Sequence, residues 1–483
     1  MSRPAPPATG AQARARRGAV RRLDQALVER DPHAERDPEQ SRRRAVVAGV
    51  VLAVLGLAAA AVVGLVRGDA DWRAATIVRG VPSGALYVVA REPTSPSSSP
   101  SPRPPWLVPT TDLSSARLLA AGVDRRRADP AAGLAPADPT PVRDDALVGV
   151  ERTVPVGLAG APSVLPDTAA APTPDVWAVC DVPAGPGVRA IVLAGEAALG
   201  RPLATGESLL LRGDDGRTWL VTDGRRAAID PAEGAVVRAL DVAGVPARPA
   251  GSALLGALPE AAPLVPPRIA GAGVAPTDVA TRTLGLPVGA VARVAGTPPR
   301  FVVVLDRGVQ EVPDVVAELV RFASPGADPR VAEVPAAVVD GLPRAVGVDL
   351  TAYPRAFPGV LSVEDAPVAC AAPTASGATT VSVAGTLPSP VPPTPVGDPA
   401  TPGPVGAVRV AGAGAYVVPV APGEPADPDR GVVVDQVGRV FPVAGRGAAA
   451  ALGLGDPRPA PRSVVGLLPR GPVLSLEAAR TFR

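Results

Sequence analysis

The sequence predicts an α+β protein. A single-pass transmembrane helix precedes a large β-rich extracytoplasmic domain, in which four strand-hairpin-helix repeats surround a discontinuous central β domain. Three observations predict this arrangement. Residues 45–66 form an unbroken apolar run, a hairpin pattern recurs along the rest of the chain, and the only two cysteines, Cys180 and Cys370, lie in separate stretches between the repeats.

The apolar run, AVVAGVVLAVLGLAAAAVVGLV, occupies residues 45–66. As a helix it extends about 33 Å, enough to cross a hydrocarbon core of about 30 Å. It begins after Arg42, Arg43 and Arg44 and ends before Arg67. Arginines are denser before the run than after it, so the positive-inside rule places the leader in the cytoplasm and everything past Arg67 outside. Arginines beside the bilayer also attract anionic lipid headgroups.

Two other interpretations of the run remain open. A cleavable signal peptide is one, because Ala58–Ala61 supplies small residues for a peptidase. The basic leader and the apolar segment of a signal peptide are usually shorter than residues 1–44 and 45–66 of this chain. A buried core helix is the other, but the run is apolar on every face and has basic residues at both ends. The pattern therefore favours a membrane span.

Composition excludes several function classes. A net charge of +2 gives no reason to expect nucleic-acid binding. The chain has no Lys, so it lacks the G-x-x-x-x-G-K-[ST] motif of a P-loop. Its single histidine, His33, lies in the leader, which leaves the exterior part without an imidazole for a catalytic triad or a zinc site. We expect no catalytic residue, no cofactor and no metal.

Asp214 and Asp215 are the carboxylate pair that remains as a candidate acid and base. They stand in the turn-like context R-G-D-D-G-R. Gly and Asp favour tight turns, so we expect a solvated hairpin tip rather than a catalytic pair.

Cys180 and Cys370 both follow the apolar run. In an oxidising extracytoplasmic space, a pair of cysteines is most simply a disulfide. Such a bond would constrain the unfolded chain by about 5 kcal/mol in the loop-entropy model. Two separately buried thiols are the alternative.

Residues 1–44 form the cytoplasmic leader. Between residues 18 and 29, Val20, Leu23, Ala26 and Leu27 stand at helical spacing among charged residues. This spacing predicts a short amphipathic helix that either lies on the membrane surface or docks on a partner.

A hairpin pattern recurs beyond the run. A β-branched strand leads into an Asp/Gly turn and a second short strand at residues 218–230, 300–313 and 431–443. A small-residue or amphipathic segment follows each hairpin, as at residues 314–322. Each unit then reaches an apolar stretch that ends in Leu-Pro, at residues 253–259, 338–343 and 464–469.

A fourth, degenerate copy comes first, at residues 84–122. It contains a Ser/Pro-rich insertion at residues 92–105, which is typical of a solvated loop. In its predicted helix, Asp112 is the expected N-cap and Gly122 the expected end.

These elements divide the exterior part into six segments. They are residues 76–139 (repeat 1), 140–216 (first half of the central domain), 217–276 (repeat 2), 277–349 (repeat 3), 350–430 (second half of the central domain) and 431–483 (repeat 4).

Several segments together resemble the EccB family, the single-pass membrane component of the actinobacterial type VII (ESX) secretion system. The resemblance covers nearly the whole chain, and the order of the segments carries its specificity. The matching segments are Ala11–Arg14, Val20–Leu23, Ala26–Leu27, Asp31–Pro32, Arg42–Arg44, Asp71–Arg73, Leu113–Leu119, Pro155–Pro162, Leu165–Pro166, Trp177–Cys180 and Leu467–Ala479.

The resemblance implies a structural subunit of an inner-membrane secretion complex. It implies EccC, EccD, EccE and a mycosin-type protease as partners, a cytoplasmic N-terminus and a periplasmic domain that self-associates. It also implies four repeats and a central domain linked by Cys180 and Cys370. Members have been described as ATPases, so an unconventional ATPase is one alternative; a repeat protein that binds peptidoglycan or another envelope polymer is the other.

Overall fold

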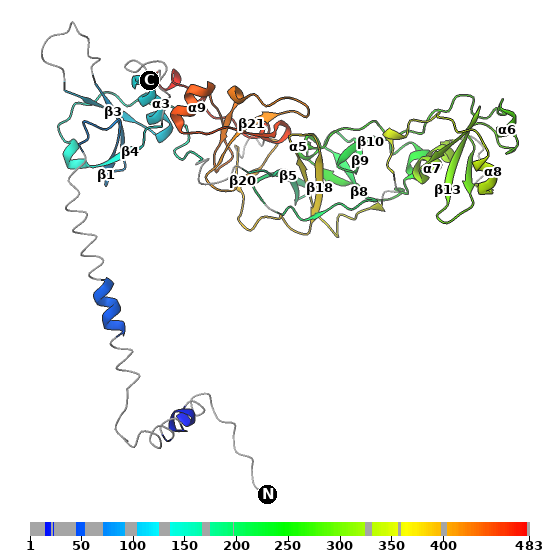
Figure 1. Ribbon diagram of the computed structural model, residues 1–483, viewed down its shortest axis with the longest axis horizontal. Coiled ribbons are helices and arrows are strands. Elements are labelled where there is room, and N and C mark those ends of the chain that lie inside the picture. Colours follow the sequence, from blue (N-terminus) through cyan, green and yellow to red (C-terminus); the bar gives the residue numbers. More distant parts are fainter. Residues whose placement is uncertain are drawn as a thin grey trace. The chain divides into compact units, whose positions relative to one another are not determined.

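The computed structural model describes residues 15–20, 23, 45–53, 71–91, 104–124, 136–166, 174–196, 198–323, 331–355, 359–397 and 403–480 (Figure 1). The chain forms two compact units, Met1–Ala70 and Asp71–Arg483.

In the first unit, residues 15–20, residue 23 and residues 45–53 are helical. Val20 and Leu23 of the predicted leader helix are therefore helical, whereas its other apolar positions lie outside the described residues. So do residues 54–66 and the flanking Arg42, Arg43, Arg44 and Arg67. Within the part of the chain that the structure describes, no helix has the length and apolar character needed to cross a membrane.

Within the described residues, the second unit contains four sheets that share one four-stranded topology, and in one of them β16 (Gly359–Val360) adds a fifth strand. In each sheet, three antiparallel strands form a meander, a helix follows, and a fourth strand returns parallel to the first. A parallel return requires a crossover, which the helix supplies. A short helix then follows the fourth strand.

The first two sheets, with the helices that belong to them, contain the following elements. Repeat 1 has β1 (Ile77–Val81), β2 (Leu86–Ala90), β3 (Trp106–Thr110), α3 (Leu113–Asp124), β4 (Pro139–Arg143) and η1 (Asp144–Leu147). Repeat 2 has β8 (Glu207–Gly213), β9 (Thr218–Thr222), β10 (Arg225–Ile229), α4 (Gly234–Ala239), β11 (Arg248–Ala250) and α5 (Ser252–Ala257).

The other two sheets repeat this order. Repeat 3 has β12 (Val291–Val294), β13 (Arg300–Leu305), β14 (Gly308–Val312), α7 (Asp314–Ala323), β15 (Ala332–Val334) and α8 (Ala336–Asp340), preceded by α6 (Val279–Arg282). Repeat 4 has β21 (Ala415–Val420), β22 (Val432–Val434), β23 (Val440–Pro442), α9 (Gly445–Leu452), β24 (Arg458–Pro461) and α10 (Arg462–Val465).

A fifth, seven-stranded sheet combines two stretches of sequence in the order β19-β20-β6-β5-β17-β18-β7. Its strands are β5 (Trp177–Ala184), β6 (Gly187–Ala194), β7 (Arg201–Pro202), β17 (Val368–Pro373), β18 (Thr379–Ala384), β19 (Thr394–Pro395) and β20 (Ala407–Val410). The short strand β16 (Gly359–Val360) pairs with β8, and η2 (Leu350–Ala352), η3 (Pro428–Arg430) and η4 (Ala478–Arg480) lie in connections.

The sheet pairing differs from the predicted segment limits at three strands. β8 and β21 lie in the predicted central segments, yet each is the inner strand of a repeat sheet, and β4 pairs with β1 of repeat 1. β8 leads into β9 through the turn at Asp214 and Asp215, so its place beside β9 follows from a local hairpin. The pairings of β8 with β11, β21 with β24 and β1 with β4 are parallel and join strands far apart in sequence, which local sequence patterns do not reveal.

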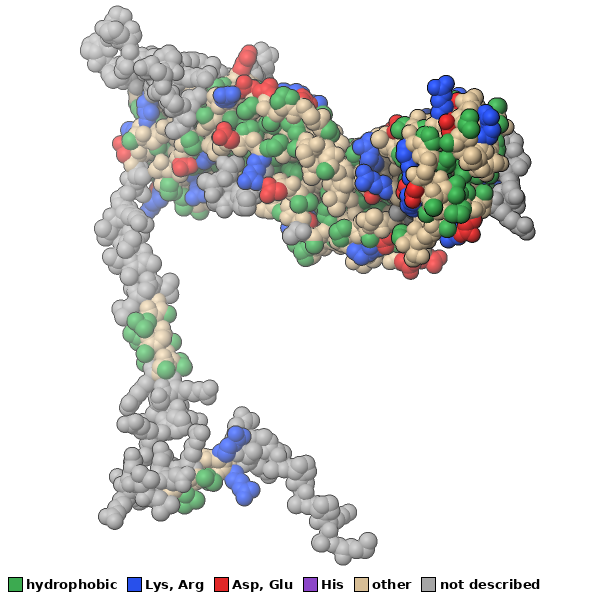
Figure 2. All heavy atoms as spheres, turned by 45° about the vertical axis from the view of Figure 1, so that its right-hand side comes forward, with side chains coloured by type: hydrophobic (Ala, Val, Ile, Leu, Met, Phe, Trp, Pro, Cys, Tyr) green, Lys and Arg blue, Asp and Glu red, His purple; other side chains and the backbone are tan. Residues whose placement is uncertain are grey.

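Buried side chains connect neighbouring sheets within the second unit. Repeats 2 and 3 share a cluster in which α4 packs against α7, and repeats 1 and 4 share one in which α3 packs against α9. Repeats 2 and 4 both pack on the central sheet through α5 and α10. On the face shown in Figure 2, arginines and acidic residues are interspersed over this unit.

A candidate binding pocket in the fourth repeat

Cys180 and Cys370 form a disulfide across 190 residues of sequence. They are directly opposite each other on β5 and β17, and both are fully buried. The predicted bond is therefore confirmed, and the alternative of two separate thiols is wrong. Because the pair joins the two halves of the central sheet and is inaccessible to solvent, its role is structural.

Asp214 and Asp215 lie in the turn between β8 and β9, and both are exposed. An oxygen of Asp215 accepts a hydrogen bond of 3.0 Å from the Arg217 amide, as in a tight turn. Among the residues that the structure describes, no group of three His, Cys, Asp or Glu side chains is placed to hold a metal ion.

All four repeats close with the same pair of backbone hydrogen bonds. In each repeat, a residue of the third strand donates its amide hydrogen to a carbonyl in the segment after the short helix. The carbonyl of the same strand residue accepts a hydrogen bond from the amide two residues later in that segment. These two hydrogen bonds flank one residue of the segment, the closing residue. The bridged pairs are Leu107 with Arg152, Arg226 with Glu260, Val309 with Arg344, and Val440 with Arg470. Repeat 1, degenerate in sequence, shares this register.

This common register defines equivalent positions in the four repeats. Five residues before the closing residue stands a buried apolar side chain from the short helix: Leu147, Leu255, Val339 and Val465. On the second strand, the facing position is Tyr87, Trp219, Val302 and Val432. A groove between these two positions is thus a shared feature of the repeats.

Side chains of the same chain fill this groove in repeats 1 to 3. In repeat 1, Tyr87 packs with Trp72 and Leu147, and in repeat 2, Trp219 packs with Leu255. In repeat 3 the smaller Val302 is covered by Leu284 and Leu286, which follow α6. A large apolar side chain occupies the equivalent space each time.

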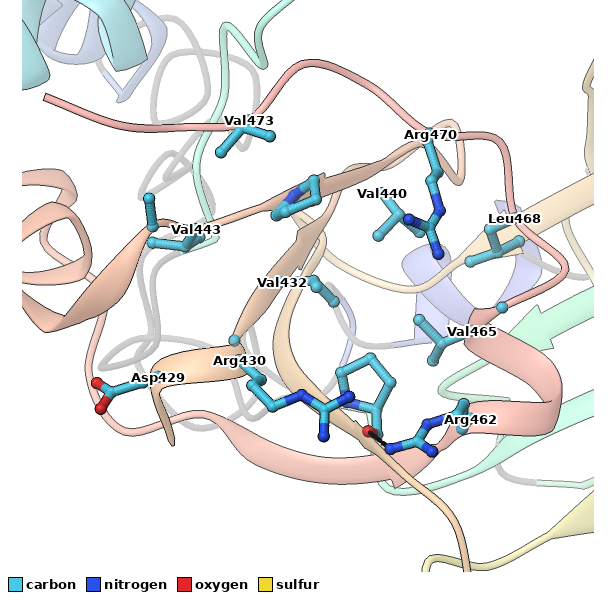
Figure 3. A pocket seen from close by; sticks show the side chains of 15 residues that line it. Asp429, Arg430, Val432, Val440, Val443, Arg462, Val465, Leu468, Arg470 and Val473 are labelled. Atoms are coloured by element: carbon cyan, nitrogen blue, oxygen red, sulfur yellow. Dashed lines mark hydrogen bonds between the residues drawn. The ribbon is translucent and has the colours of Figure 1, made fainter. Parts of the chain in front are cut away.

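In repeat 4 the facing residue is Val432, and the groove is an open pocket of about 520 Å³ (Figure 3). Its apolar lining comes from β22, β23, α10 and the segment that follows α10. The lining side chains are Val432, Val440, Val443, Val465, Leu468 and Val473. Val473 is 48% exposed, so part of this apolar surface faces solvent.

Three arginines border the pocket: Arg430, Arg462 and Arg470. Arg430 and Arg462 both bind the carboxylate of Glu424, Arg430 at 2.9 Å. The Ala421 amide, Arg462 and Arg430 lower the pKa of Glu424, which keeps it charged at neutral pH. One carboxylate thus lies between two guanidinium groups, and the site keeps a positive charge.

Arg470 differs from its counterparts in the other repeats. Arg152 lies over the Tyr87 ring, Glu260 pairs with Arg226, and Arg344 pairs with Asp340. Arg470 makes no hydrogen bond or ion pair with any residue in the described ranges. Figure 3 shows its guanidinium group next to Val440 at the edge of the pocket. The acidic lining residue, Asp429, pairs with Arg446 instead.

This pocket could not be predicted from local sequence patterns. The Leu-Pro elements can be recognised in the sequence. Nothing in the sequence shows that the residue after each Leu-Pro closes a sheet. Leu-Pro-Arg at residues 342–344 and 468–470 was the available signal. Whether a groove is filled depends on distant side chains such as Trp72 and Leu284, which no local pattern assigns.

These features define a disulfide-linked repeat protein that presents binding surfaces, a class in which stacked units contribute contacts rather than a catalytic cleft. The family described as "Type VII secretion system ESX-1, transport TM domain B" matches residues 5–483. The chain belongs to this family, EccB.

The chain is also similar in sequence and structure to individual EccB proteins. The ESX-1 secretion system ATPase EccB1 of Mycolicibacterium smegmatis (strain MKD8) is 30% identical, over 95% of this chain and 92% of that protein. A chain in the structure of an intact ESX-5 inner membrane complex is 25% identical with a TM-score of 0.66, covering 99% of this chain and 96% of that chain. The EccB3 dimer from the ESX-3 core complex gives 26% identity and a TM-score of 0.67, over 84% of this chain and 100% of that chain.

Proposed function

We propose that this protein is a structural subunit of a type VII secretion inner-membrane complex. Residues 45–66 cross the membrane once, Arg42, Arg43, Arg44 and Arg67 flank the span, and the leader is cytoplasmic. The unit that begins at Asp71 lies in the periplasm. The buried disulfide supports this placement, because disulfides persist in oxidising compartments.

The site residues follow from this topology. The flanking arginines contact lipid headgroups and fix the orientation of the span. Cys180 and Cys370 hold the two halves of the central domain together, and the four repeats form around it. The family's partners, EccC, EccD, EccE and a mycosin-type protease, would contact the leader and the repeats. Copies of the chain associate with one another, as a relative's dimer suggests.

The observation that carries this proposal is the fourfold closure of the repeats. Four sheets of one topology pack side chains against neighbouring sheets, and repeats 2 and 4 also pack on the central sheet. Such an array offers several equivalent surfaces to partners, as a scaffold requires.

Co-purification tests the assembly. After mild detergent extraction, the tagged chain should elute with other membrane proteins in one large complex; a lone monomer would contradict the proposal. Replacing Arg42, Arg43 and Arg44 by Glu should misorient the span and abolish the complex. Changing the same three arginines to Lys keeps the positive charge beside the span, so this variant is the matched control and should leave the complex intact.

A second function is suggested by the names of the relatives, which are called ATPases. With no Lys in the chain, a P-loop is excluded. Phosphate release by the purified full chain, measured against a heat-denatured control, separates the two functions. The structural proposal requires none, and activity above the control would favour an unconventional ATPase.

A further inference from the structure

The repeat 4 pocket differs from its counterparts because none of the described residues fills it with a large apolar side chain. Tyr87 and Trp219 occupy the groove in repeats 1 and 2, and Leu284 with Leu286 covers it in repeat 3. Val432 leaves a volume of about 520 Å³. This is about seventeen times the volume that one water molecule occupies in the liquid, about 30 Å³, so the pocket has room for an aromatic ring.

The arrangement around Arg470 indicates that the pocket suits an aromatic ring. In repeat 1 the guanidinium of Arg152, which closes that sheet, lies 5.2 Å from the centroid of Tyr87. In repeat 2, Arg226 lies 4.5 Å from the centroid of Trp219. Both are cation–π contacts between a closing-pair arginine and the aromatic residue in the groove. Repeat 4 has the arginine at the closing position and has Val432 where the aromatic residue would be.

Charge indicates what flanks the ring. Glu424 compensates only one of the two guanidinium groups it binds, those of Arg430 and Arg462, and Arg470 has no acidic partner in the described part of the chain. Guanidinium groups at a pocket edge bind carboxylates through charge-assisted hydrogen bonds. The edge is therefore complementary to acidic rather than basic neighbours.

We propose that the repeat 4 pocket binds a tryptophan or tyrosine side chain from an acidic segment of a partner protein. The ring lies against Val473 in the open part of the pocket, above the buried side chains of Val432, Val440 and Val465, and Arg470 stacks on it. Carboxylates on either side of the aromatic residue contact Arg430 and Arg470. The partner's aromatic side chain supplies in this pocket the packing that Tyr87 and Trp219 supply within repeats 1 and 2. Its chemistry does not depend on the assembly proposed above.

Fluorescence anisotropy with labelled peptides and the full-length protein in detergent tests this proposal. The probe is Gly-Ser-Asp-Glu-Trp-Glu-Asp-Ser-Gly, with capped ends. Two comparison peptides replace its Trp by Ala, or its four acidic residues by Arg. We expect binding of the Trp peptide and at least tenfold weaker binding of both others. No binding of the probe, or equal binding of either comparison peptide, would overturn the proposal.

Three variants locate the site. Val432→Trp copies repeat 2 and should fill the pocket, which lowers affinity at least tenfold while the fold remains. Arg470→Gln should lower affinity about tenfold, because it removes the stacking charge. Arg344→Gln, the equivalent change in repeat 3, is the matched control and should bind like the unchanged protein. Undiminished binding by Val432→Trp, or equal losses in Arg470→Gln and Arg344→Gln, would show that the peptide binds elsewhere.

Melting temperatures separate a loss of folding from a loss of binding. The melting temperatures of Val432→Trp and Arg470→Gln should stay close to that of the unchanged protein. Should Val432→Trp fail to fold, Val440→Phe fills the same pocket from β23 and serves in its place. The loss of peptide binding with an intact melting transition is the expected result, whereas retained binding in both filled variants refutes the site.

Discussion

Asp181 of β5 accepts a 2.7 Å hydrogen bond from the Gly251 amide, at the start of α5. This contact ties the central sheet to repeat 2 immediately beside the disulfide at Cys180. The second carboxylate oxygen of Asp181 is buried without a hydrogen-bond partner. A charged group in this position is costly, which makes the junction sensitive to protonation.

Burial raises the pKa of Asp181 to about 6; the Gly251 amide and Arg248 oppose the shift, and Asp214 adds to it. A folded-state pKa above the unfolded value of about 3.9 favours folding at low pH, and this contribution is lost as pH rises through about 6. Charged Asp181 then costs about 3 kcal/mol at pH 7. Asp181→Asn should therefore melt higher than the unchanged protein at pH 8.

The same pair of proteins at pH 4 supplies the control for this prediction. At pH 4 the folded-state carboxyl is protonated, as is about half of the unfolded-state carboxyl, so the advantage of Asn should shrink from about 3 to about 0.5 kcal/mol. Thermal melting of the full chain in detergent at pH 4 and pH 8 measures the stability advantage of Asp181→Asn. An advantage that is equal at both, or larger at pH 4, would refute the assigned cause.

The disulfide should resist reduction in the folded protein, because Cys180 and Cys370 are fully buried. Maleimide labelling after dithiothreitol treatment should modify both cysteines only when urea is present. The double change of Cys180 and Cys370 to Ser should lower stability by about 5 kcal/mol or less in the loop-entropy model. Rapid labelling in dithiothreitol alone would mean that the sheet opens readily.

Gly308 has a φ of +131°, and a Cβ there would lie 2.3 Å from the carbonyl oxygen of Pro343. That carbonyl accepts the closing hydrogen bond of repeat 3 from Val309. Gly308→Ala should therefore break the closure and cost about 2–3 kcal/mol. Hydrogen exchange at the Val309 amide reports it directly.

Gly244→Ala is the matched control for this change. Gly244 has a φ of +76° with open space around its Cβ position, so only backbone strain of about 1 kcal/mol is expected. Unaltered protection of Val309 in Gly308→Ala would contradict the role of the close approach.

Gln310 is buried in β14 and binds the segment after α8 from both ends of its amide. Its oxygen accepts from the amides of Gly347 and Val348 at 2.7 and 2.8 Å, and its nitrogen donates to the Val348 carbonyl at 2.7 Å. Gln310→Leu leaves three backbone groups without partners and should cost about 3 kcal/mol.

Glu311→Gln, one residue further, is the control, because Glu311 forms only an exposed ion pair with Arg300. Such pairs contribute about 0–1 kcal/mol. Thermal melting should show a clear drop for Gln310→Leu alone; comparable drops in both variants would indicate a general weakness of repeat 3.

Local features were predictable from sequence. The hairpins that lead into β10, β14 and β23 follow from alternating β-branched residues and Asp/Gly turns, since both partners lie within a few residues of each other. Asp112 was predicted as the N-cap of α3, and its carboxylate accepts the Ser115 amide at 2.7 Å. The predicted end at Gly122 was wrong, because α3 continues to Asp124.

Long-range pairing was not predictable in the same way. The parallel pairings of β8 with β11 and of β21 with β24 join strands that are far apart in sequence. The membrane span stays a prediction, since most of its residues lie outside the described ranges. The pocket residues Val432 and Arg470 gain their meaning only from what fills the equivalent groove in the other repeats.

The repeating hairpins, the pair of cysteines and the exclusion of a P-loop by the lack of Lys can be read from residue types and from contacts between near neighbours in the chain. The tertiary structure alone decided that Val440 meets Arg470 and that the groove beside them stays open. Closing a sheet and filling a groove require side chains from remote segments, and their approach is set by packing of the whole unit.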